Sequence, residues 1–179
     1  MPLALRPTWL IGSARSLRSA WPPWTFCEGR FMKVQPDFKD LLALFNENKV
    51  EYMIVGGYAL AFHGAPRYTG DMDLFVRPDP TNARRVMASL EKFGFGSVGL
   101  TAADFEKPDS IVQLGITPVR IDIITSLTGV SWDNAVSHRA EGKYGDLPVF
   151  YIGREQFIAN KRATGRKRDL ADLEALGEE

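Results

Sequence analysis

The chain has 179 residues, of which 45% are hydrophobic and 25% are charged. This length and composition fit one globular domain with a sizeable core, and no stretch is long and apolar enough to be expected to cross a membrane. The 22 basic and 22 acidic residues give a formal net charge of zero, so there is no global electrostatic reason to expect nucleic-acid binding.

Residues 1–31 differ in composition from the rest of the chain. They hold three of the four tryptophans, the only cysteine (Cys27), and four arginines against one acid, which is a net charge of +3. They show no clear periodicity, so we expect a poorly structured extension before a domain at residues 32–179. That domain has no cysteine, which excludes an internal disulfide and is compatible with a reducing cytoplasm, the expected location.

Two explanations of the extension are open. We favour Met32 as the natural start, because Glu28-Gly29-Arg30 can be encoded by a purine-rich run that resembles a ribosome-binding site. A transit peptide is the alternative, whereas a bacterial signal peptide would need a longer apolar core than Trp9-Leu10-Ile11.

Helical and strand patterns alternate along the rest of the chain. We therefore expect an α/β (α+β) fold with a mixed β-sheet, flanking helices and further helices at the C-terminus. The expected helices are Pro36–Glu47, Gly57–His63, Thr81–Phe93, Ser131–His138, Glu155–Ala163 and Lys167–Leu176. The expected strands are Glu51–Val55, Asp71–Val76, Ser110–Leu114, Val119–Thr125 and Leu147–Tyr151, with Gly115–Pro118 as the turn between the third and the fourth.

A Gly-Gly pair follows the first expected strand. Gly56 and Gly57 let the chain turn sharply after the apolar run Tyr52–Val55 and leave backbone amides open to an anion. The helix that follows presents the positive end of its dipole there. The pair therefore predicts a site for the phosphates of a triphosphate.

An Asp-x-Asp pair begins the second expected strand. Residues two apart on a strand share a face, so Asp71 and Asp73 point the same way while Met72 and Leu74 pack behind them. Two carboxylates this close repel each other unless a cation lies between them. Hard cations prefer oxygen ligands and keep phosphate oxygens in their shell, so the pair predicts a Mg²⁺ site, with Mn²⁺ as an alternative.

Asp122 is the candidate for a third carboxylate. It is the only acid in the apolar run Val119–Ile124, and burial of an unpaired carboxylate is costly. A cation or hydrogen-bond donors are therefore expected beside it. The alternative is that Asp122 lies on a solvated face of an edge strand.

The order of strand, Gly-Gly, helix and Asp-x-Asp resembles the nucleotidyltransferase superfamily of the polymerase-beta type. In that superfamily a Gly-Gly or Gly-Ser precedes a short helix and an Asp-x-Asp or Asp-x-Glu, and a later strand aspartate completes a carboxylate triad. Gly56, Gly57, Asp71, Asp73 and Asp122 occupy these places here. The resemblance implies the nucleotidyltransferase fold and the three aspartates as catalytic metal ligands.

The segment from about Asp37 to Leu176 is similar to small prokaryotic AbiEii-like nucleotidyltransferase toxins. Their C-terminal part often carries a lysine, then Gly-Arg, then Lys-Asp-Leu and a second Asp-Leu. This order is matched by Lys161, Gly165-Arg166, Arg168-Asp169-Leu170 and Asp172-Leu173, with arginine in place of the usual lysine before Asp169. The resemblance implies nucleotide binding by Lys161 and Arg166 and an antitoxin partner.

The remaining polar candidates have two interpretations each. The basic cluster of Lys161, Arg162, Arg166, Lys167 and Arg168 contacts a polyanion or forms a solvated helix face. Arg67 and Thr69 orient nucleotide or merely belong to the loop before Asp71. Asp169 and Asp172, three apart on a helix, favour salt bridges or capping. His63 and His138, without spaced partners, favour packing or capping over metal binding.

Two other Asp-x-Asp families fit less well. Haloacid-dehalogenase-like phosphatases carry the pair at the end of an apolar strand, whereas polar residues precede Asp71 here and apolar residues follow Asp73. Nucleotide-sugar glycosyltransferases generally use a larger nucleotide-binding domain before the pair, for which this chain has little room.

The expected function is metal-dependent transfer of a nucleoside monophosphate from an NTP to an acceptor hydroxyl, with release of pyrophosphate. The acceptor, a protein, a tRNA or a small molecule, stays open, as does the identity of the NTP. The alternative is a catalytically inactive nucleotide-binding or regulatory partner protein with the same fold, because function does not follow from fold.

Overall fold

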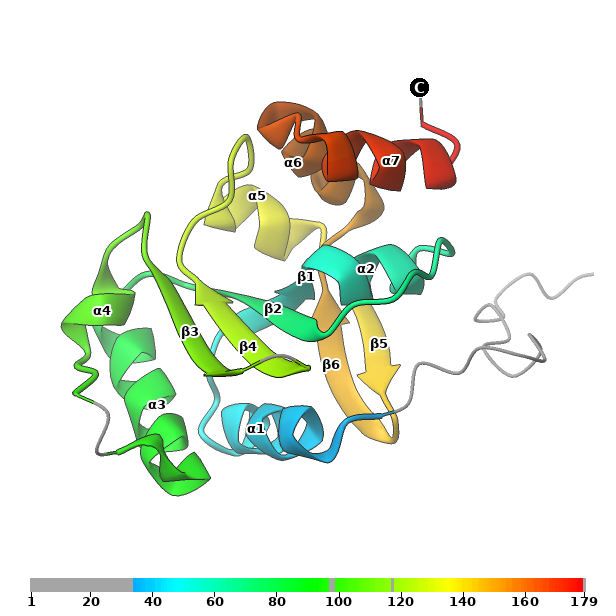
Figure 1. Cartoon of the computed structure of the whole chain (residues 1–179). Coiled ribbons are helices and arrows are strands. Elements are labelled where there is room, and N and C mark those ends of the chain that lie inside the picture. Colours follow the sequence, from blue (N-terminus) through cyan, green and yellow to red (C-terminus); the bar gives the residue numbers. More distant parts are fainter. Residues whose placement is uncertain (1–33, 97–98, 117, 179) are drawn as a thin grey trace, which may run out of the picture. The chain divides into compact units, whose positions relative to one another are not determined.

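A six-stranded mixed β-sheet organises the chain (Figure 1). The structure, a computed structural model, describes residues 34–96, 99–116 and 118–178. The strands are β1 (Tyr52–Val55), β2 (Asp71–Val76), β3 (Ile111–Ile116), β4 (Val119–Ile124), β5 (Ala140–Tyr144) and β6 (Leu147–Tyr151), in the spatial order β3-β4-β2-β1-β6-β5. The pairs β1–β6 and β2–β4 are parallel, and the other three pairs are antiparallel.

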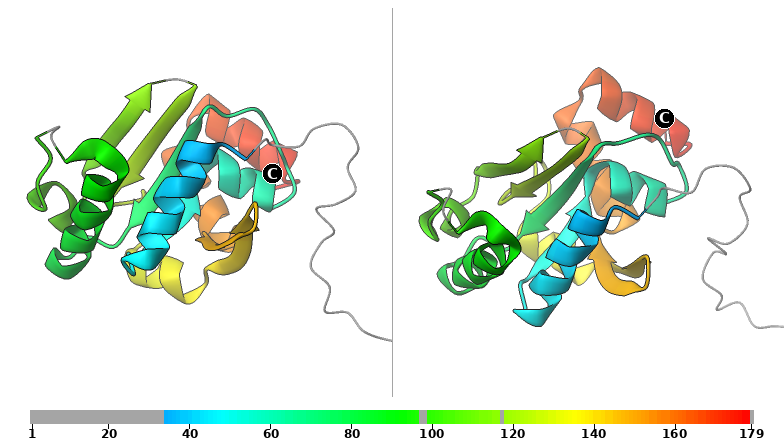
Figure 2. Two further views of the ribbon diagram at one scale, coloured as in Figure 1. Left: turned by 90° about the horizontal axis from the view of Figure 1, so that it is seen from below. Right: turned by 60° about the horizontal axis from the view of Figure 1, so that its bottom comes forward.

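Helices lie on both faces of this sheet. They are α1 (Pro36–Glu47), α2 (Gly56–Phe62), α3 (Pro80–Leu90), α4 (Ala103–Glu106), α5 (Trp132–Ser137), α6 (Arg154–Thr164) and α7 (Lys167–Ala175). Seen from below in the left view of Figure 2, α1 and α3 lie in front of the sheet, and α6 and α7 lie behind it.

The core follows from the apolar periodicity of the helices and strands. In α1 the buried residues Phe38, Leu41, Leu42 and Phe45 repeat at helical spacing and form one stripe. In β2 the completely buried Met72, Leu74 and Val76 alternate with Asp71 and Asp73. One face of β2 therefore packs in the core, and the other carries the carboxylates.

The expected fold class is confirmed, and each expected helix and strand is present. Most ends differ by a residue or two from the expected ones. One correction concerns β3, which continues to Ile116, so the turn expected at Gly115–Pro118 is wrong: Gly115 pairs with Arg120 and Ile116 with Val119. The backbone ladder with β4 outweighs the preference of glycine to break a strand.

Two further elements were not expected, and one helix ends early. Strand β5 has the polar sequence AEGKY, whose strand propensity is low, and it depends on antiparallel pairing with β6. Helix α4 is a single turn. Helix α3 ends at Leu90 rather than Phe93, and a π-helical turn, Glu91–Phe95, follows it.

The predictions for residues 1–31 lie outside the described residues and stay predictions. Among the helices of residues 34–96, 99–116 and 118–178, none combines the length and the apolar character that crossing a membrane requires.

Candidate active site

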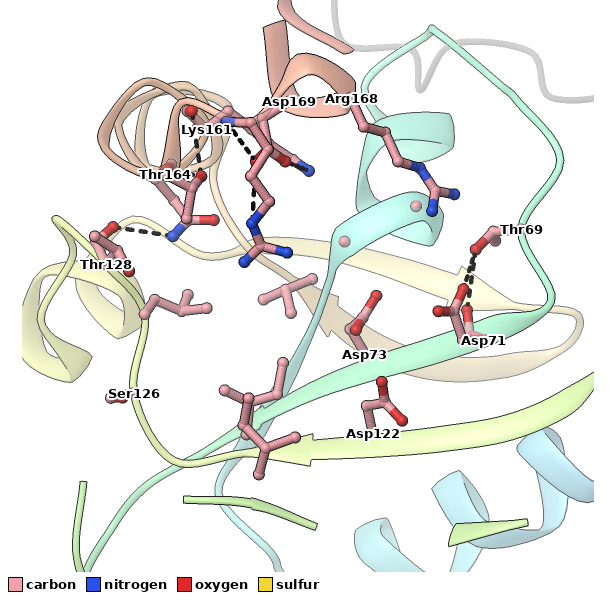
Figure 3. Close-up of a pocket in the computed structure, with 18 of the residues that line it drawn as sticks. Thr69, Asp71, Asp73, Asp122, Ser126, Thr128, Lys161, Thr164, Arg168 and Asp169 are labelled. Carbon is pink, nitrogen blue, oxygen red and sulfur yellow. Dashed lines mark hydrogen bonds and ion pairs between the residues drawn. The ribbon is translucent and has the colours of Figure 1, made fainter. Parts of the chain in front are cut away.

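A cavity of about 520 Å³ lies on the face of the sheet that carries the carboxylates. Strands β2 and β4 form its floor, and residues from α6 and α7 form the opposite wall (Figure 3). All of the site residues that the sequence singles out line this cavity: Gly56, Gly57, Arg67, Thr69, Asp71, Asp73, Asp122, Lys161 and Arg166. The fold thus brings together residues up to 110 positions apart in the sequence.

The register of β2 and β4 aligns the carboxylates. In this parallel pair Asp73 lies opposite Asp122, and Asp71 lies opposite Arg120. Because alternate residues of a strand share a face, the three carboxylates face the cavity together. Strand β4 lies between β3 and β2, and Asp122 is only 7% exposed, so the alternative of a solvated edge strand for Asp122 is wrong.

Arg120 pairs with two of the three carboxylates. Its Nε donates to Asp122 Oδ1 at 2.9 Å, and its Nη2 donates to Asp71 Oδ2 at 2.8 Å and to Asp122 Oδ2 at 3.0 Å. Arg120 is not among the site residues predicted from the sequence. Its position two residues before Asp122, on the same face of one strand, was the signal that could have found it.

The electrostatics of Asp71 and Asp73 differ. Burial, and then repulsion by Asp71 and Asp122, raise the pKa of Asp73 to about 6. Burial also acts to raise the pKa of Asp71, but a hydrogen bond from the Thr69 hydroxyl and the charge of Arg120 outweigh it, and the pKa lies below its ordinary value. Of these two carboxylates, Asp73 is the one whose negative charge has less support from its surroundings.

The donor set fits a hard divalent cation. Asp71, Asp73 and Asp122 offer oxygen ligands, and burial, together with repulsion by the other two carboxylates, raises the pKa of Asp73. Within the described part of the chain, no group of three or more Asp, Glu, His and Cys side chains is arranged to hold a metal ion. The guanidinium of Arg120 pairs with oxygens of Asp71 and Asp122.

Gly56 and Gly57 close one side of the cavity at the start of α2. Gly56 has a φ of 61°, a backbone conformation that side chains with a Cβ rarely adopt. A Cβ there would overlap Asp73 Oδ2, and a Cβ at Gly57 would lie 2.9 Å from Thr69 Cβ. The absence of both side chains thus lets the backbone approach the carboxylate and the loop before β2.

Replacing Gly56 by alanine is expected to displace Asp73 and to reduce the activity of the site by about 100-fold or more, with a loss of about 1–3 kcal/mol in unfolding free energy. Gly64→Ala is the matched control, because Gly64 also has a positive φ but nothing lies within 4 Å of its Cβ position. It should lose stability without loss of activity. Equal activity in the two variants would contradict the close packing of Gly56 against Asp73.

A buried ion network joins the C-terminal helices to the loop before β2. Arg67 donates to both oxygens of Asp172, at 2.6 and 3.1 Å, and Lys161 Nζ lies 2.7 Å from Asp169 Oδ1 and 2.9 Å from Asp172 Oδ2. The Asp172 side chain is 2% exposed. Asp169 also accepts from the backbone amide of Arg166 at the start of α7.

This network confirms the salt-bridge and capping roles expected of Asp169 and Asp172. Hydrogen bonds from Arg67 and Lys161 hold the pKa of Asp172 below its ordinary value against the opposing effect of burial. Within the basic cluster, Lys161 is buried, whereas Arg162, Arg166, Lys167 and Arg168 are exposed. Nucleotide binding by Lys161, Arg67 and Arg166 stays a prediction.

Arg168, a member of the basic cluster, extends from α7 toward Thr69 and Asp71 (Figure 3), and its charge contributes to lowering the pKa of Asp71. Other polar residues that line the cavity were not predicted from the sequence. Asn160 binds the carbonyl of Thr128 through its side chain, 32 residues away. No local pattern signals such pairs. Ser126 and Thr164 also line the cavity, as do the apolar Ile111, Ile124 and Leu127.

The histidines have the capping and packing roles expected of them. His63 ends α2, and its ring Nε2 lies 2.8 Å from the carbonyl oxygen of Ile152. His138 ends α5, and its Nδ1 lies 2.9 Å from the carbonyl oxygen of Asn134. Neither residue lines the cavity.

Comparison with solved structures shows that the fold is a known one. The antibiotic-resistance factor ANT(2'')-Ia superimposes with a TM-score of 0.52 at 15% sequence identity, covering 79% of this chain and 80% of that one. A candidate nucleotidyltransferase from Thermotoga maritima superimposes with a TM-score of 0.51 at 13% identity, covering 79% and 92%. No family model and no curated protein matches the chain. The nucleotidyltransferase fold expected from the sequence is thus confirmed.

Proposed function

We propose that the protein is a metal-dependent nucleotidyltransferase that moves a nucleoside monophosphate from an NTP to an acceptor hydroxyl. The observation that carries the proposal is the alignment of Asp71, Asp73 and Asp122 on one face of β2 and β4, beside the Gly56-Gly57 turn, in one cavity. The shared fold with a candidate nucleotidyltransferase supports it.

The acceptor oxygen attacks the α-phosphorus of the NTP, and the bond from this phosphorus to the bridging oxygen of the leaving pyrophosphate breaks. Asp122 accepts the proton of the acceptor hydroxyl. The backbone at Gly56 and Gly57 receives the triphosphate, and Arg166 and Arg168, exposed at the opposite wall, neutralise its charge. Thr69 orients Asp71 through its hydroxyl hydrogen bond.

Asp71, Asp73 and Asp122 would hold Mg²⁺ or Mn²⁺. Such an ion, when bound, neutralises the charge of the phosphates and of the attacking and leaving oxygens. Lys161 lies in the helical wall opposite the carboxylates, 2.7 Å from Asp169, and its charge acts on Asp73.

The biological setting is part of the proposal. The similarity of the C-terminal motif to AbiEii-like toxins supports a role as the toxin of a toxin-antitoxin pair, with a protein, a tRNA or a small molecule as the acceptor. We place this activity in the cytoplasm, where NTPs are abundant.

Transfer of label from α-labelled NTPs tests the proposal. The full chain and the chain that starts at Met32 are incubated with each NTP, Mg²⁺ and cell lysate, and label is followed into protein, RNA and small molecules. We expect metal-dependent transfer from one NTP into one acceptor class. Binding of a nucleotide without transfer to any class would favour the alternative, an inactive regulatory partner protein.

A further inference from the structure

Two of the three carboxylates at the candidate metal site already have a cation. Arg120 Nη2 bridges Asp71 Oδ2 and Asp122 Oδ2 at 2.8 and 3.0 Å, and Nε holds the other oxygen of Asp122 at 2.9 Å. Asp73 is different, because no ion pair among the described residues includes it. The cluster thus has one carboxylate without a paired cation and two that share a guanidinium.

We propose that Arg120 is a resident counter-cation that a divalent metal ion must displace from Asp71 and Asp122 when it binds. The inference rests on the proposed function for the identity of the metal site. A small divalent cation binds carboxylate oxygens at about 2.0–2.1 Å. A guanidinium about 3 Å from the same oxygens would then lie beside a double positive charge, so the two cations compete for Asp71 and Asp122.

Arg120 is placed so that it can leave. Its side chain is 31% exposed and lines the cavity, so the guanidinium can turn toward solvent without opening a hole in the core. Gln113 Nε2, 3.4 Å from Asp122 Oδ2, lies on the neighbouring strand β3 and keeps Asp122 oriented when Arg120 moves. Asp73, which has no ion pair among the described residues, is the position where the incoming ion first finds an open ligand.

The consequence is a metal site that is weakened in the resting protein. Part of the binding free energy of the ion is used to break the contacts of Arg120 with two carboxylates. Removal of Arg120 therefore strengthens metal binding, although it leaves the metal-free cluster less stable. If Arg120 had a merely structural role, its removal would weaken metal binding, because its loss would disorder the ligands.

The test is Mn²⁺ binding to the nucleotide-free full chain, measured by the electron paramagnetic resonance signal of free Mn²⁺. Arg120→Gln is expected to bind Mn²⁺ roughly tenfold more tightly than the wild type. Arg120→Lys keeps the charge but cannot bridge both carboxylates through a planar group. Its Mn²⁺ affinity should lie between those of the wild type and Arg120→Gln. Arg168→Gln is the matched control, because it removes one positive charge from the same cavity without removing an ion pair to Asp71 or Asp122.

Thermal unfolding gives a second readout. Without metal, Arg120→Gln should unfold at a lower temperature than the wild type, and saturating Mn²⁺ should raise its unfolding temperature by more than it raises that of the wild type. If Arg120→Gln is poorly folded without metal, the unfolding temperatures of Arg120→Lys and the wild type are compared instead, with and without Mn²⁺.

Three results would contradict the displacement of Arg120. They are Mn²⁺ binding by Arg120→Gln that is no tighter than that of the wild type, an equal gain in Mn²⁺ affinity by Arg168→Gln, and no Mn²⁺ binding by the wild type or by Arg120→Gln. The label-transfer experiment separates this proposal from the function. If the wild type transfers label but Arg120→Gln binds Mn²⁺ no more tightly, the proposed nucleotidyl transfer stands and the counter-cation role of Arg120 is refuted. If Arg120→Gln binds Mn²⁺ more tightly but the wild type transfers no label, the counter-cation role is supported and the proposed nucleotidyl transfer is refuted.

Discussion

Replacing Asp73 by asparagine is expected to reduce nucleotidyl transfer by about 10³-fold or more while the protein stays folded. Asp73 lies opposite Asp122 in the sheet, its carboxylate lies directly against the position where a Cβ of Gly56 would be, and it faces the cavity. Asparagine keeps the shape but removes the negative charge that would hold a cation. The measurement is label transfer from α-labelled NTPs, together with circular dichroism to verify folding.

The same variant should be more stable than the wild type when no metal is present. The raised pKa of Asp73, about 6 instead of 3.8, means that its ionised form is disfavoured in the folded state. A shift of about two pKa units corresponds to at most about 3 kcal/mol, so we expect a gain of about 1–3 kcal/mol in unfolding free energy at pH 7.5. Because the pKa of Asp73 is higher in the folded than in the unfolded state, ionised Asp73 destabilises the wild type fully above pH 6. This destabilisation disappears as the pH falls toward 3.8.

Asp133→Asn is the control for both measurements, since Asp133 is exposed on α5 and does not line the cavity. It should keep the activity and the metal-free stability of the wild type. Retained transfer by Asp73→Asn would rule out Asp73 as an essential ligand. A loss of metal-free stability in that variant would show that Asp73 is supported by its surroundings after all.

Replacing Asp172 by alanine is expected to lower the unfolding free energy by about 3 kcal/mol, the lower end of the range for breaking a buried ion pair. The change leaves Arg67 without its carboxylate and Lys161 with Asp169 alone. The estimate is at the lower end because the Arg67 side chain is 27% exposed and can turn toward water. Urea denaturation at pH 7 measures the difference.

Glu174→Ala is the matched control for Asp172→Ala, because it removes an acid from an exposed position of the same helix. It should change the unfolding free energy by less than about 0.5 kcal/mol. A double-mutant cycle of Arg67→Ala and Asp172→Ala should give a double variant that loses less than the sum of the two single losses. Additive losses would mean that Arg67 and Asp172 contribute independently.

The pH dependence of this difference follows from the lowered pKa of Asp172. The stabilisation by Asp172 is fully present above its unfolded pKa of 3.8 and is lost as the pH falls through the lower folded pKa. The wild type should therefore approach the stability of Asp172→Ala in acid. A difference that stays constant from pH 7 to pH 3 would show that the charge of Asp172 does not carry the effect.

The sequence by itself predicted the fold class and part of the cavity, because alternation along strands and a glycine turn are local signals. Alternation along a strand determines that Asp71 and Asp73 share a face, and glycine alone tolerates the positive φ that the turn at Gly56 requires. The apolar residues around Asp122 indicated a buried carboxylate but left a solvated edge strand open, and the position of β4 between β3 and β2 excluded that alternative. These properties depend on a few neighbouring residues and need no knowledge of the rest of the chain.

The tertiary structure decided which charges meet. The register of β2 with β4 sets Arg120 beside Asp71, 49 positions away, and the packing of α7 sets Asp172 against Arg67, 105 positions away. The edge strand β5 is polar and contains a glycine, and it forms because it pairs with β6. Strand pairing and ion pairs between distant residues depend on how the sheet and helices pack, and no local pattern of the sequence carries that information.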